Sequence, residues 1–475
     1  MNKPLVLVAA AALCVPIMAS GASAQAAPAP VPPGGSIIAA YSLTAPVGAT
    51  PSGLVARAIV PNGIDCPVLV TTHASGAQKR TKMRERKAPV TTDNAFAALR
   101  ACSANIPAGA SRAVVGSRTI PASLPKQTGS IAVFGDTGCR LKGSTVQDCN
   151  DPAAWPLARV AQSVAREKPD LIVFTGDFFY REAACPDSLA SECGASPAPI
   201  PGMPFKDSAL AWQADVFNPM APVLASAPIV VTRGNHEACY RGGNGYFIYF
   251  DPREGTEGTC APVEQPDGSL VVPPLGVTPS FAVDVPVTSS RSLRLVVVDS
   301  ADGQDCEVSS ILPQQRAAYE AAQRLAAKKK ESWLIVHRPV AAWQMAADCA
   351  PEGSWIAADQ QVGSYGLLGD YSVMVSSHIH TVQTMNIPGI PPQVVLGNGG
   401  TLLETAVPFS LPTTGPSFDD SLAYPAPTSG WWEMSFGYAM VHPRAGGGWQ
   451  WDMKHVDGTP MRDCVLAGRM RCLAP

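Results

Sequence analysis

The chain lacks the sequence features of a membrane-spanning, nucleic-acid-binding or repeat protein. After the N-terminal segment, no stretch approaches the ~20 apolar residues that a membrane span needs. Basic residues are not in excess: 35 Lys and Arg stand against 38 Asp and Glu, so the net charge of −3 gives no bulk electrostatic reason to expect nucleic acid. The basic run at residues 79–87 contains no aromatic residue, and we interpret it as a solvated hairpin or loop. No internal repeat is evident.

The N-terminus has the features of an export signal. Lys3 supplies a positive charge, an apolar stretch follows, and Ala22-Ser23-Ala24 offers a small-residue cleavage site. We therefore predict a signal peptide over residues 1–24 and a secreted or periplasmic protein. A lipid anchor on Cys14 is the alternative, but a lipoprotein signal needs a small residue where this chain has Leu13.

Cysteine is abundant, yet no two cysteines have the C-x-x-C spacing typical of thiolate zinc sites. Of 13 cysteines, removal of Cys14 with the signal leaves 12, and an even count in an exported chain predicts disulfides. Sequence alone leaves the connectivity open. Pairing of neighbours would close short loops at 139–149, 185–193, 239–260 and 464–472.

The distribution of residue types indicates two folded regions in a chain of 475 residues, of which 46% are hydrophobic. After an Ala/Pro-rich lead-in at 25–35, residues 36–125 contain short β-like runs separated by Gly, Pro and Asn, which predict a small β-sandwich domain. From residue 129 to 475, strand and helix patterns alternate, with helices expected near 155–167 and 208–225. We expect two sheets packed together with helices outside.

Five short motifs carry polar residues that can bind metal ions. They are Gly135-Asp136-Thr137-Gly138, Gly176-Asp177-Phe178-Phe179-Tyr180, Gly234-Asn235-His236-Glu237, Val336-His337-Arg338-Pro339 and Ser377-His378-Ile379-His380. All except the Gly234 motif directly follow apolar, β-branched runs that read as strand ends: IAVF, LIVFT, WLIV and SVMVS. Side chains from distant parts of the chain can therefore converge on cations at one rim of a sheet.

The residue types in the motifs suit two adjacent cations. Such a pair needs hard anionic oxygens, at least one of them bridging, together with neutral imidazoles. Asp136 and Asp177 can supply the carboxylates, and Asn235 can supply its amide oxygen. His236 cannot easily bind the same ion from a tight turn, so it is free to face a substrate.

The remaining histidines of the motifs complete the imidazole set. His378 and His380 are two residues apart, a spacing that would send them to opposite faces of a strand. In a loop just past the strand end the pair can instead straddle two metals, which is the interpretation we prefer. His337 is the third imidazole.

The order of the five motifs resembles that of the calcineurin-like metallophosphoesterase superfamily, and most closely that of the purple acid phosphatases. The resemblance covers about residues 131–400. It implies a four-layer α/β/β/α sandwich as the catalytic domain, over residues 129–475. The β-rich region before it is similar to the small all-β, fibronectin-like domain of many such phosphatases.

One exchange supports the comparison with purple acid phosphatases. Many members of the superfamily have a metal-binding histidine at the end of the first motif, where this chain has Gly138. Tyr180 can fill the vacancy, because purple acid phosphatases have an Fe(III)-binding tyrosine at this distance from the bridging carboxylate Asp177. Two departures are Ser377, in place of the usual glycine, and the V-H spacing at His337, in place of V-x-x-H.

The resemblance implies a role for each motif residue. The first metal, expected to be Fe(III), would be held by Asp136, Asp177, Tyr180 and His380. The second, expected to be Fe, Zn or Mn, would be held by Asp177, Asn235, His337 and His378. His236 would contact the phosphoryl group or protonate the leaving oxygen.

The expected function is an exported phosphatase that hydrolyses phosphomonoesters by attack of a metal-activated hydroxide. Its partner would be a small phosphate ester, with no nucleic-acid scaffold and no membrane span. One alternative is a phosphodiesterase acting on nucleotides, nucleic-acid ends or phospholipid headgroups through the same metals. Another is a non-catalytic binding protein of the same fold, which the complete ligand set disfavours.

Four further residues, in or near the motifs, have open roles. Arg233 and Arg338 flank metal motifs and are suited equally to pairing with phosphate or to structural salt bridges. Asp299 follows a buried strand and fits a role behind the metal ligands or in a turn. Glu237 is expected to form hydrogen bonds within its own turn.

Overall fold

A computed structural model describes most of the chain after residue 36. The described residues are 37–88, 94–193, 205–261, 263–264, 270–271, 276–329, 331–344, 349, 353–405 and 408–473. The predicted signal peptide (1–24) and lead-in (25–35) lie outside them. None of the helices in these described ranges is long and apolar enough to cross a membrane.

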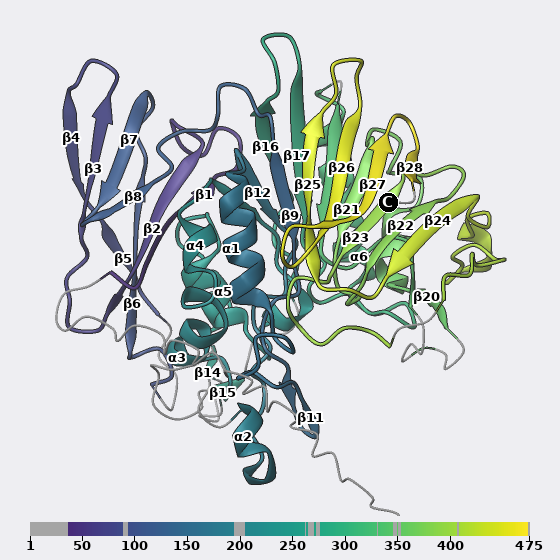
Figure 1. Ribbon diagram of the computed structural model, residues 1–475, viewed down its shortest axis with the longest axis horizontal. Helices are drawn as coiled ribbons and strands as arrows, with labels where there is room; N and C mark the ends of the chain where they lie inside the picture. Colours follow the sequence, from purple (N-terminus) through teal and green to yellow (C-terminus); the bar gives the residue numbers. More distant parts are fainter. Residues whose placement is uncertain are drawn as a thin grey trace, which may run out of the picture.

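Two large sheets form the centre of the molecule (Figure 1). At the middle of the 11-stranded sheet are the parallel strands β9 (Ile131–Phe134), β12 (Leu171–Phe174) and β13 (Ile229–Val231). On one side the sheet continues with the antiparallel strands β25 (Gly437–Pro443), β26 (Trp449–His455), β27 (Pro460–Leu466) and β28 (Met470–Leu473). The seven-stranded sheet consists, in spatial order, of β16 (Phe281–Pro286), β17 (Ser292–Val298), β18 (Ser332–Val336), β21 (Val373–Ser376), β23 (Gln393–Leu396), β22 (Val382–Asn386) and β24 (Ser429–Glu433).

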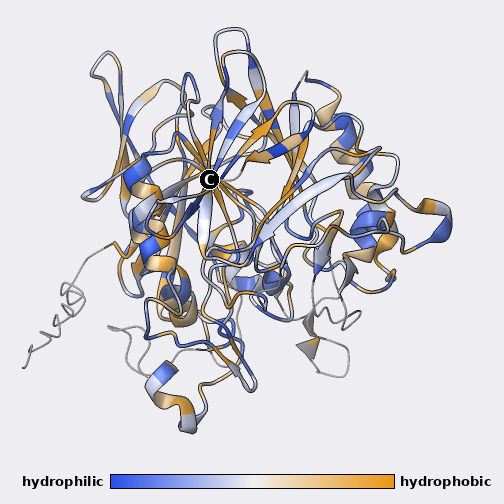
Figure 2. Ribbon diagram, turned by 45° about the vertical axis from the view of Figure 1, so that its right-hand side comes forward, coloured by the Kyte–Doolittle hydropathy of each residue, from blue (hydrophilic) through white to orange (hydrophobic). Residues whose placement is uncertain are grey.

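The two sheets bury their facing sides against each other. Val133 and Val173 of the large sheet belong to the same apolar cluster as Ile335 of the smaller one. Trp449 and Trp451 lie fully buried in this cluster, with ring centroids 4.8 and 5.3 Å from that of Trp333. In Figure 2 the hydrophobic colour accordingly gathers on interior strands, whereas loops are largely hydrophilic.

Helices cover the outer faces, so the predicted α/β/β/α order is confirmed. Those on the large sheet are α1 (Leu157–Glu167), α3 (Ala209–Trp212), α4 (Ala221–Leu224) and α5 (Gly243–Tyr249). The smaller sheet is covered by α6 (Leu312–Ala326), which packs against α7 (Ala358–Ser364). In α1 the buried residues Leu157, Val160, Ala161 and Val164 recur at helical spacing, which gives one apolar face.

The helix expected at 208–225 is interrupted. A π-helical turn, Gln213–Phe217, follows α3, and α4 begins only at Ala221. The irregular turn contains Asp215, whose fully buried carboxylate pairs with Arg181 at 2.6 Å. The hydrophobic pattern could not show this interruption, because the partner of Asp215 comes from another loop.

Several short strands, helices and turns lie within the connections between these layers. They are β10 (Leu141–Lys142), β11 (Thr145–Val146), α2 (Ala190–Cys193), β14 (Val263–Glu264), β15 (Leu270–Val271), β19 (Ala342–Gln344), β20 (Ser354–Ile356) and the 3₁₀ turns Asp187–Leu189, Asn235–Glu237 and Asp420–Leu422.

The N-terminal region is all-β, as predicted, but one of its layers continues the large sheet. The strands in that layer are β1 (Ala39–Thr44), β2 (Leu54–Pro61), β6 (Leu99–Asn105) and β5 (Arg84–Arg86). The junction is a parallel pairing of β1 with β13 through Leu43 and Ile229. A separate sheet packs on this layer and contains β4 (Gln78–Lys82), β3 (Val68–His73), β7 (Ala110–Val115) and β8 (Arg118–Ile120).

The basic run at residues 79–87 differs in part from its prediction. β4 forms an exposed hairpin with β3, as expected for a solvated segment. Arg86, however, is 3% exposed and donates hydrogen bonds to the carbonyl oxygens of Phe247 (2.6 Å) and Ile248 (3.0 Å). This arginine therefore joins the N-terminal layer to α5 instead of facing solvent.

Six disulfides join all 12 cysteines of the described residues. Four of them are the predicted neighbour pairs, 139–149, 185–193, 239–260 and 464–472. The other two, Cys66–Cys102 and Cys306–Cys349, close longer loops. This many disulfides is characteristic of an oxidising, extracellular-type compartment.

Candidate metal centre

The motif residues meet at one rim of the two sheets. Asp136 and Asp177 follow the adjacent parallel strands β9 and β12, while His337 and His378 follow β18 and β21 of the facing sheet. Three of these residues have left-handed backbone: Asp136 (φ 54°), Asp177 (φ 57°) and His378 (φ 75°). Such a conformation is unfavourable for non-glycine residues and gathers at functional sites.

The four residues predicted to hold the first metal lie together around one hydroxyl group. The Tyr180 Oη atom lies 2.7 Å from Asp136 Oδ1, 2.8 Å from Asp177 Oδ2 and 3.0 Å from His380 Nε2. His380 Nδ1 donates its hydrogen to the Leu402 carbonyl oxygen at 2.7 Å, so its Nε2 lone pair faces the cluster.

The residues predicted to hold the second metal form an adjoining cluster. Asp177 Oδ2 lies 3.2 Å from His337 Nε2, and the side-chain amide of Asn235 lies 2.8 Å from both His337 Nε2 and His378 Nδ1. His337 Nδ1 donates to the Thr175 carbonyl oxygen at 2.9 Å, which leaves the Nε2 lone pair pointing inward. Asp177 takes part in both clusters, as a bridging ligand must.

The donor set fits two cations. Asp136 and Asp177 are fully buried carboxylates that share one hydroxyl neighbour. Burial and the Asp177 charge raise the pKa of Asp136 well above its usual range. Burial also acts to raise the pKa of Asp177, but its electrostatic and hydrogen-bonding interactions with His337, His236 and Arg241 outweigh burial and hold that pKa low. Two cations would compensate the buried negative charge and accept the inward-facing imidazole lone pairs.

The backbone leaves no room for a side chain at Gly138. A Cβ atom there would lie 2.7 Å from both Phe178 O and Tyr180 N and 2.8 Å from Asp215 Oδ2. A histidine at this position is therefore incompatible with the loop conformation. Ser377 does fit in place of the usual glycine, and its hydroxyl donates to the Thr175 carbonyl oxygen at 2.7 Å.

Glu237 does more than stabilise its own turn. Its carboxylate accepts hydrogen bonds from the backbone N–H groups of Gly234 (2.9 Å), Asp177 (2.9 Å), Phe178 (2.8 Å) and Phe179 (3.2 Å). The second and third motifs are thereby held against each other. Because its carboxylate contacts backbone N–H groups, Glu237 has a positional role.

His236 lies beside the clusters in a charged environment. Its Nδ1 atom is 2.8 Å from Glu182 Oε1, and Arg241 Nη2 lies 2.7 Å from its Nε2. Burial and then the Arg241 charge lower the pKa of His236 to about 3, so the ring is neutral near pH 7. Glu182 and Arg241 lie in loops outside every motif, so no sequence pattern pointed to them.

Arg233 and Arg338 have different roles. Arg233 forms a structural, buried ion pair with Asp299 at 3.0 Å and with Asp302 at 3.1 Å. Arg338 instead reaches the second of the two side-chain clusters, where its Nη1 atom lies 3.0 Å from His378 Nε2. The position of Asp299 is thereby explained by its turn and its arginine partner.

Asp305 holds the outer side of His378. Its Oδ2 atom lies 3.1 Å from His378 Nε2, and its carboxylate also pairs with Arg338. A carboxylate behind a histidine ligand fixes the orientation of the ring. The sequence offered no signal for Asp305, since it follows no strand end and belongs to no motif; its neighbour Cys306 anchors the loop to Cys349.

We predict that Asp305→Asn weakens the second metal position selectively. Loss of a carboxylate behind a histidine ligand lowers metal affinity by about 10- to 100-fold, because the ring is no longer held in place. Titration of the apoprotein with Zn(II) would measure this change. The exposed Asp370→Asn variant is the control, and equal affinities in both variants would remove Asp305 from the site.

The two clusters lie at the base of a polar cavity of about 450 Å³. Three arginines, Arg140, Arg241 and Arg338, contribute to its wall. Their N–H groups can donate to anionic oxygens.

Comparison with known proteins gives a family match and similarities to solved structures. The model of the family described as calcineurin-like phosphoesterase matches residues 129–382, more than half of the chain. The fold is similar to that of purple acid phosphatase PPD1 from yellow lupin (Lupinus luteus) seeds, with a TM-score of 0.51, 11% identity, and coverage of 89% of this chain and 73% of that chain. A structure of PhoD gives a TM-score of 0.49 and 12% identity, covering 92% of both chains. No curated protein sequence matches the chain.

Proposed function

Because this chain belongs to the calcineurin-like phosphoesterase family, we propose that it is an exported phosphatase that hydrolyses phosphomonoesters at a two-metal site. The observation that carries the proposal is the pair of adjoining clusters that share Asp177. Family membership itself supports a metal-dependent phosphoric ester hydrolase. The disulfides and the N-terminal signal pattern support export to an extracellular or periplasmic space.

We propose two metal positions. Fe(III) is proposed at the position of Asp136, Asp177, Tyr180 and His380; Fe, Zn or Mn is proposed at the position of Asp177, Asn235, His337 and His378. When bound, such ions acidify a water molecule and neutralise charge on the phosphoryl group. The protein's own contribution is to hold the ligands, to keep the inner nitrogens unprotonated and to present arginine N–H donors to the substrate.

His236 is proposed to contact the phosphoryl group or the leaving oxygen. Glu182 accepts the Nδ1–H, so Nε2 is the nitrogen left for a substrate once Arg241 moves away; it must take up a proton before it can donate to an oxygen, and the Glu182 carboxylate favours that protonation. His236 lines the cavity, and its Nε2 atom lies 3.9 Å from Oδ2 of Asp177, the carboxylate that the two clusters share.

The substrate class is tested with the metal-loaded protein. We expect turnover of p-nitrophenyl phosphate and much slower turnover of bis(p-nitrophenyl) phosphate, with both activities lost after chelation and restored by metal. Preference for the diester would instead favour the phosphodiesterase alternative. Binding of two metals without turnover of either ester would favour a non-catalytic protein.

For His236→Ala we expect metals to be retained and kcat for p-nitrophenyl phosphate to fall by about 10²- to 10³-fold, the range of a lost proton-transfer or transition-state contact. Metal analysis and steady-state kinetics would measure both effects. His455→Ala is the control, because His455 lies outside the motifs. An unchanged rate in His236→Ala would remove this residue from the mechanism.

A further inference from the structure

Arg140 is a cationic residue at the metal site that belongs to none of the predicted roles. It lines the 450 Å³ cavity together with His236 and His380. Its guanidinium carbon lies 5.6 Å from the centre of the Tyr180 ring. The side chain thus carries a positive charge to the side of the cavity where the first metal is proposed.

The charge of Arg140 is left available, unlike the charges of the other two arginines in the cavity wall. Arg241 pairs with Glu182, and Arg338 pairs with Asp305. Within the described part of the chain, no carboxylate lies at ion-pair distance from the Arg140 guanidinium. A guanidinium beside two cations is unfavourable unless an anion joins them, so this arrangement favours an anionic ligand.

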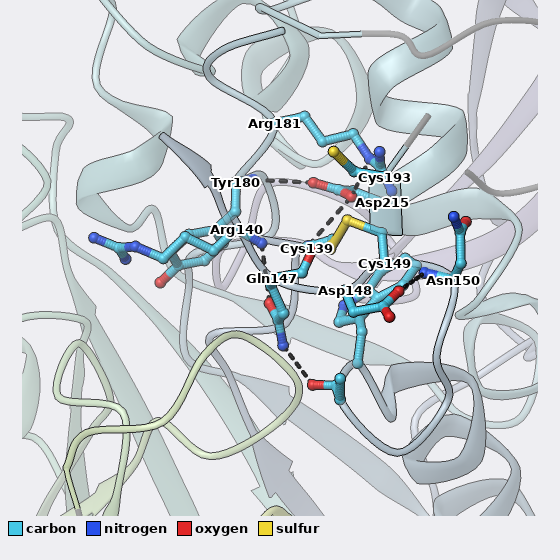
Figure 3. The surroundings of a disulfide bond; sticks show 12 residues. Cys139, Arg140, Gln147, Asp148, Cys149, Asn150, Tyr180, Arg181, Cys193 and Asp215 are labelled. Atoms are coloured by element: carbon cyan, nitrogen blue, oxygen red, sulfur yellow. Dashed lines mark hydrogen bonds and ion pairs between the residues drawn. A yellow bond between two sulfur atoms is a disulfide. The ribbon is translucent and has the colours of Figure 1, made fainter. Parts of the chain in front are cut away.

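The backbone at Arg140 is held firmly. The residue directly follows Cys139, whose disulfide to Cys149 closes the loop, and Figure 3 shows the Arg140 side chain pointing away from this disulfide. The Arg140 backbone N–H donates to Gln147 Oε1 at 3.0 Å. The next residue, Leu141, donates its N–H to the Tyr180 carbonyl oxygen at 3.0 Å.

Gln147 ties this backbone to two further segments of the chain. It is 2% exposed, and its amide nitrogen donates to the carbonyl oxygens of Ala154 (2.7 Å) and Gly400 (2.8 Å). Figure 3 shows the Gln147 side chain between the Arg140 backbone and the neighbouring loop. The base of the arginine is therefore fixed relative to the metal clusters, which reduces the freedom that binding must remove.

We propose that Arg140 is a substrate-binding residue that selects doubly charged, monoester-type phosphoryl groups. The proposal rests on the proposed function and adds a cause for its substrate class. A phosphomonoester dianion has three non-bridging oxygens, so one remains for a guanidinium after two have faced the metals. A phosphodiester has two non-bridging oxygens and a single charge. Guanidinium groups suit phosphate oxygens because their N–H donors form a planar fork.

The test compares four metal-loaded proteins: wild type, Arg140→Ala, Arg140→Lys and the control Arg159→Ala, in which an exposed arginine of α1 is removed. We expect Arg140→Ala to lower kcat/KM for p-nitrophenyl phosphate by about 10- to 100-fold, the loss of one charge-assisted hydrogen bond. The value for bis(p-nitrophenyl) phosphate should change by less than about threefold. Arg140→Lys should recover part of the monoester activity, since it keeps the charge and loses the fork.

Two further measurements distinguish phosphate binding by Arg140 from mere support of the Tyr180 ring. The inhibition or dissociation constant of inorganic phosphate should rise in Arg140→Ala while metal content stays at the wild-type level. An Fe(III) ion bound to the Tyr180 phenolate is expected to give a visible charge-transfer band. If Arg140 only supported the Tyr180 ring, this band would shift and kcat/KM would fall equally for both substrates, which would overturn the proposal. Phosphate binding is measured without turnover, so a wild type that hydrolyses no monoester would refute the proposed function, whereas unchanged phosphate binding in Arg140→Ala would refute the role of Arg140.

Discussion

The Asp177→Asn variant is expected to lose both metals and to lower kcat/KM for p-nitrophenyl phosphate by at least ~10³-fold. Asp177 Oδ2 lies 2.8 Å from Tyr180 Oη in one cluster and 3.2 Å from His337 Nε2 in the other, so one substitution removes an anionic ligand from each. Metal stabilisation of phosphoryl charge is worth several kcal/mol, and each ~1.4 kcal/mol is a factor of ten in rate.

Metal content, activity and thermal unfolding should be measured together for Asp177→Asn. The carboxamide keeps an oxygen that can accept the His236 backbone N–H, which now donates to Asp177 Oδ1 at 2.8 Å, so the fold should persist. Asp463→Asn, on the exposed face of β27, is the matched control. A folded Asp177→Asn protein with two metals and wild-type activity would show that Asp177 does not bridge the site.

The Tyr180→Phe variant is expected to lose completely the visible charge-transfer band of the iron-loaded, oxidised protein. Burial and then the charges of Asp136 and Asp177 raise the pKa of Tyr180 well above its usual range, so a phenolate forms here only when a cation binds it. Fe(III) is the cation that suits this hard anionic donor. Phenylalanine keeps the ring and its packing while it removes the one atom that would reach the metal.

The absorption spectrum and the iron content of this variant should be compared with those of Tyr319→Phe. Tyr319 is also buried, but its hydroxyl donates to Gln360 Oε1 at 2.8 Å behind the smaller sheet, away from the site. A band that persists in Tyr180→Phe would assign the colour to another ligand. A wild type with two metals and no band would show that divalent ions occupy the site and that Tyr180 does not bind iron.

Four of the five motifs could be placed at strand ends from the sequence, because each directly follows a signal that is local along the chain. Apolar runs mark the ends of β9, β12, β18 and β21, and the polar residues after them must emerge at the rim of their sheet. The residues that support them carry no such signal. Glu182, Asp305 and Arg241 lie in irregular loops, and their partners are distant in sequence, so no periodicity or spacing connects them.

The two features of the fold that differ from the prediction also depend on contacts between distant parts of the chain. Both faces of β1 are buried, as in a strand covered on two sides, but sequence could not tell which strand would pair with its edge. That edge pairs with β13, so the N-terminal layer continues the sheet on which Asp136 and Asp177 are mounted. The interrupted helix around Asp215 has a comparable cause, since Arg181 approaches it from another loop.

By itself, the sequence determined most of the elements, the layer order, the presence of disulfides and the candidate metal donors, because hydrophobic periodicity and residue chemistry act over short distances along the chain. Only the tertiary structure decided which groups stand behind those donors, which arginines are neutralised and which charge is left for a ligand. Electrostatic interactions depend on distance in space and on burial, and both are set by chain segments far apart in sequence. Arg140 is the clearest case: its position in the sequence is unremarkable, and its availability follows entirely from which carboxylates the fold places elsewhere.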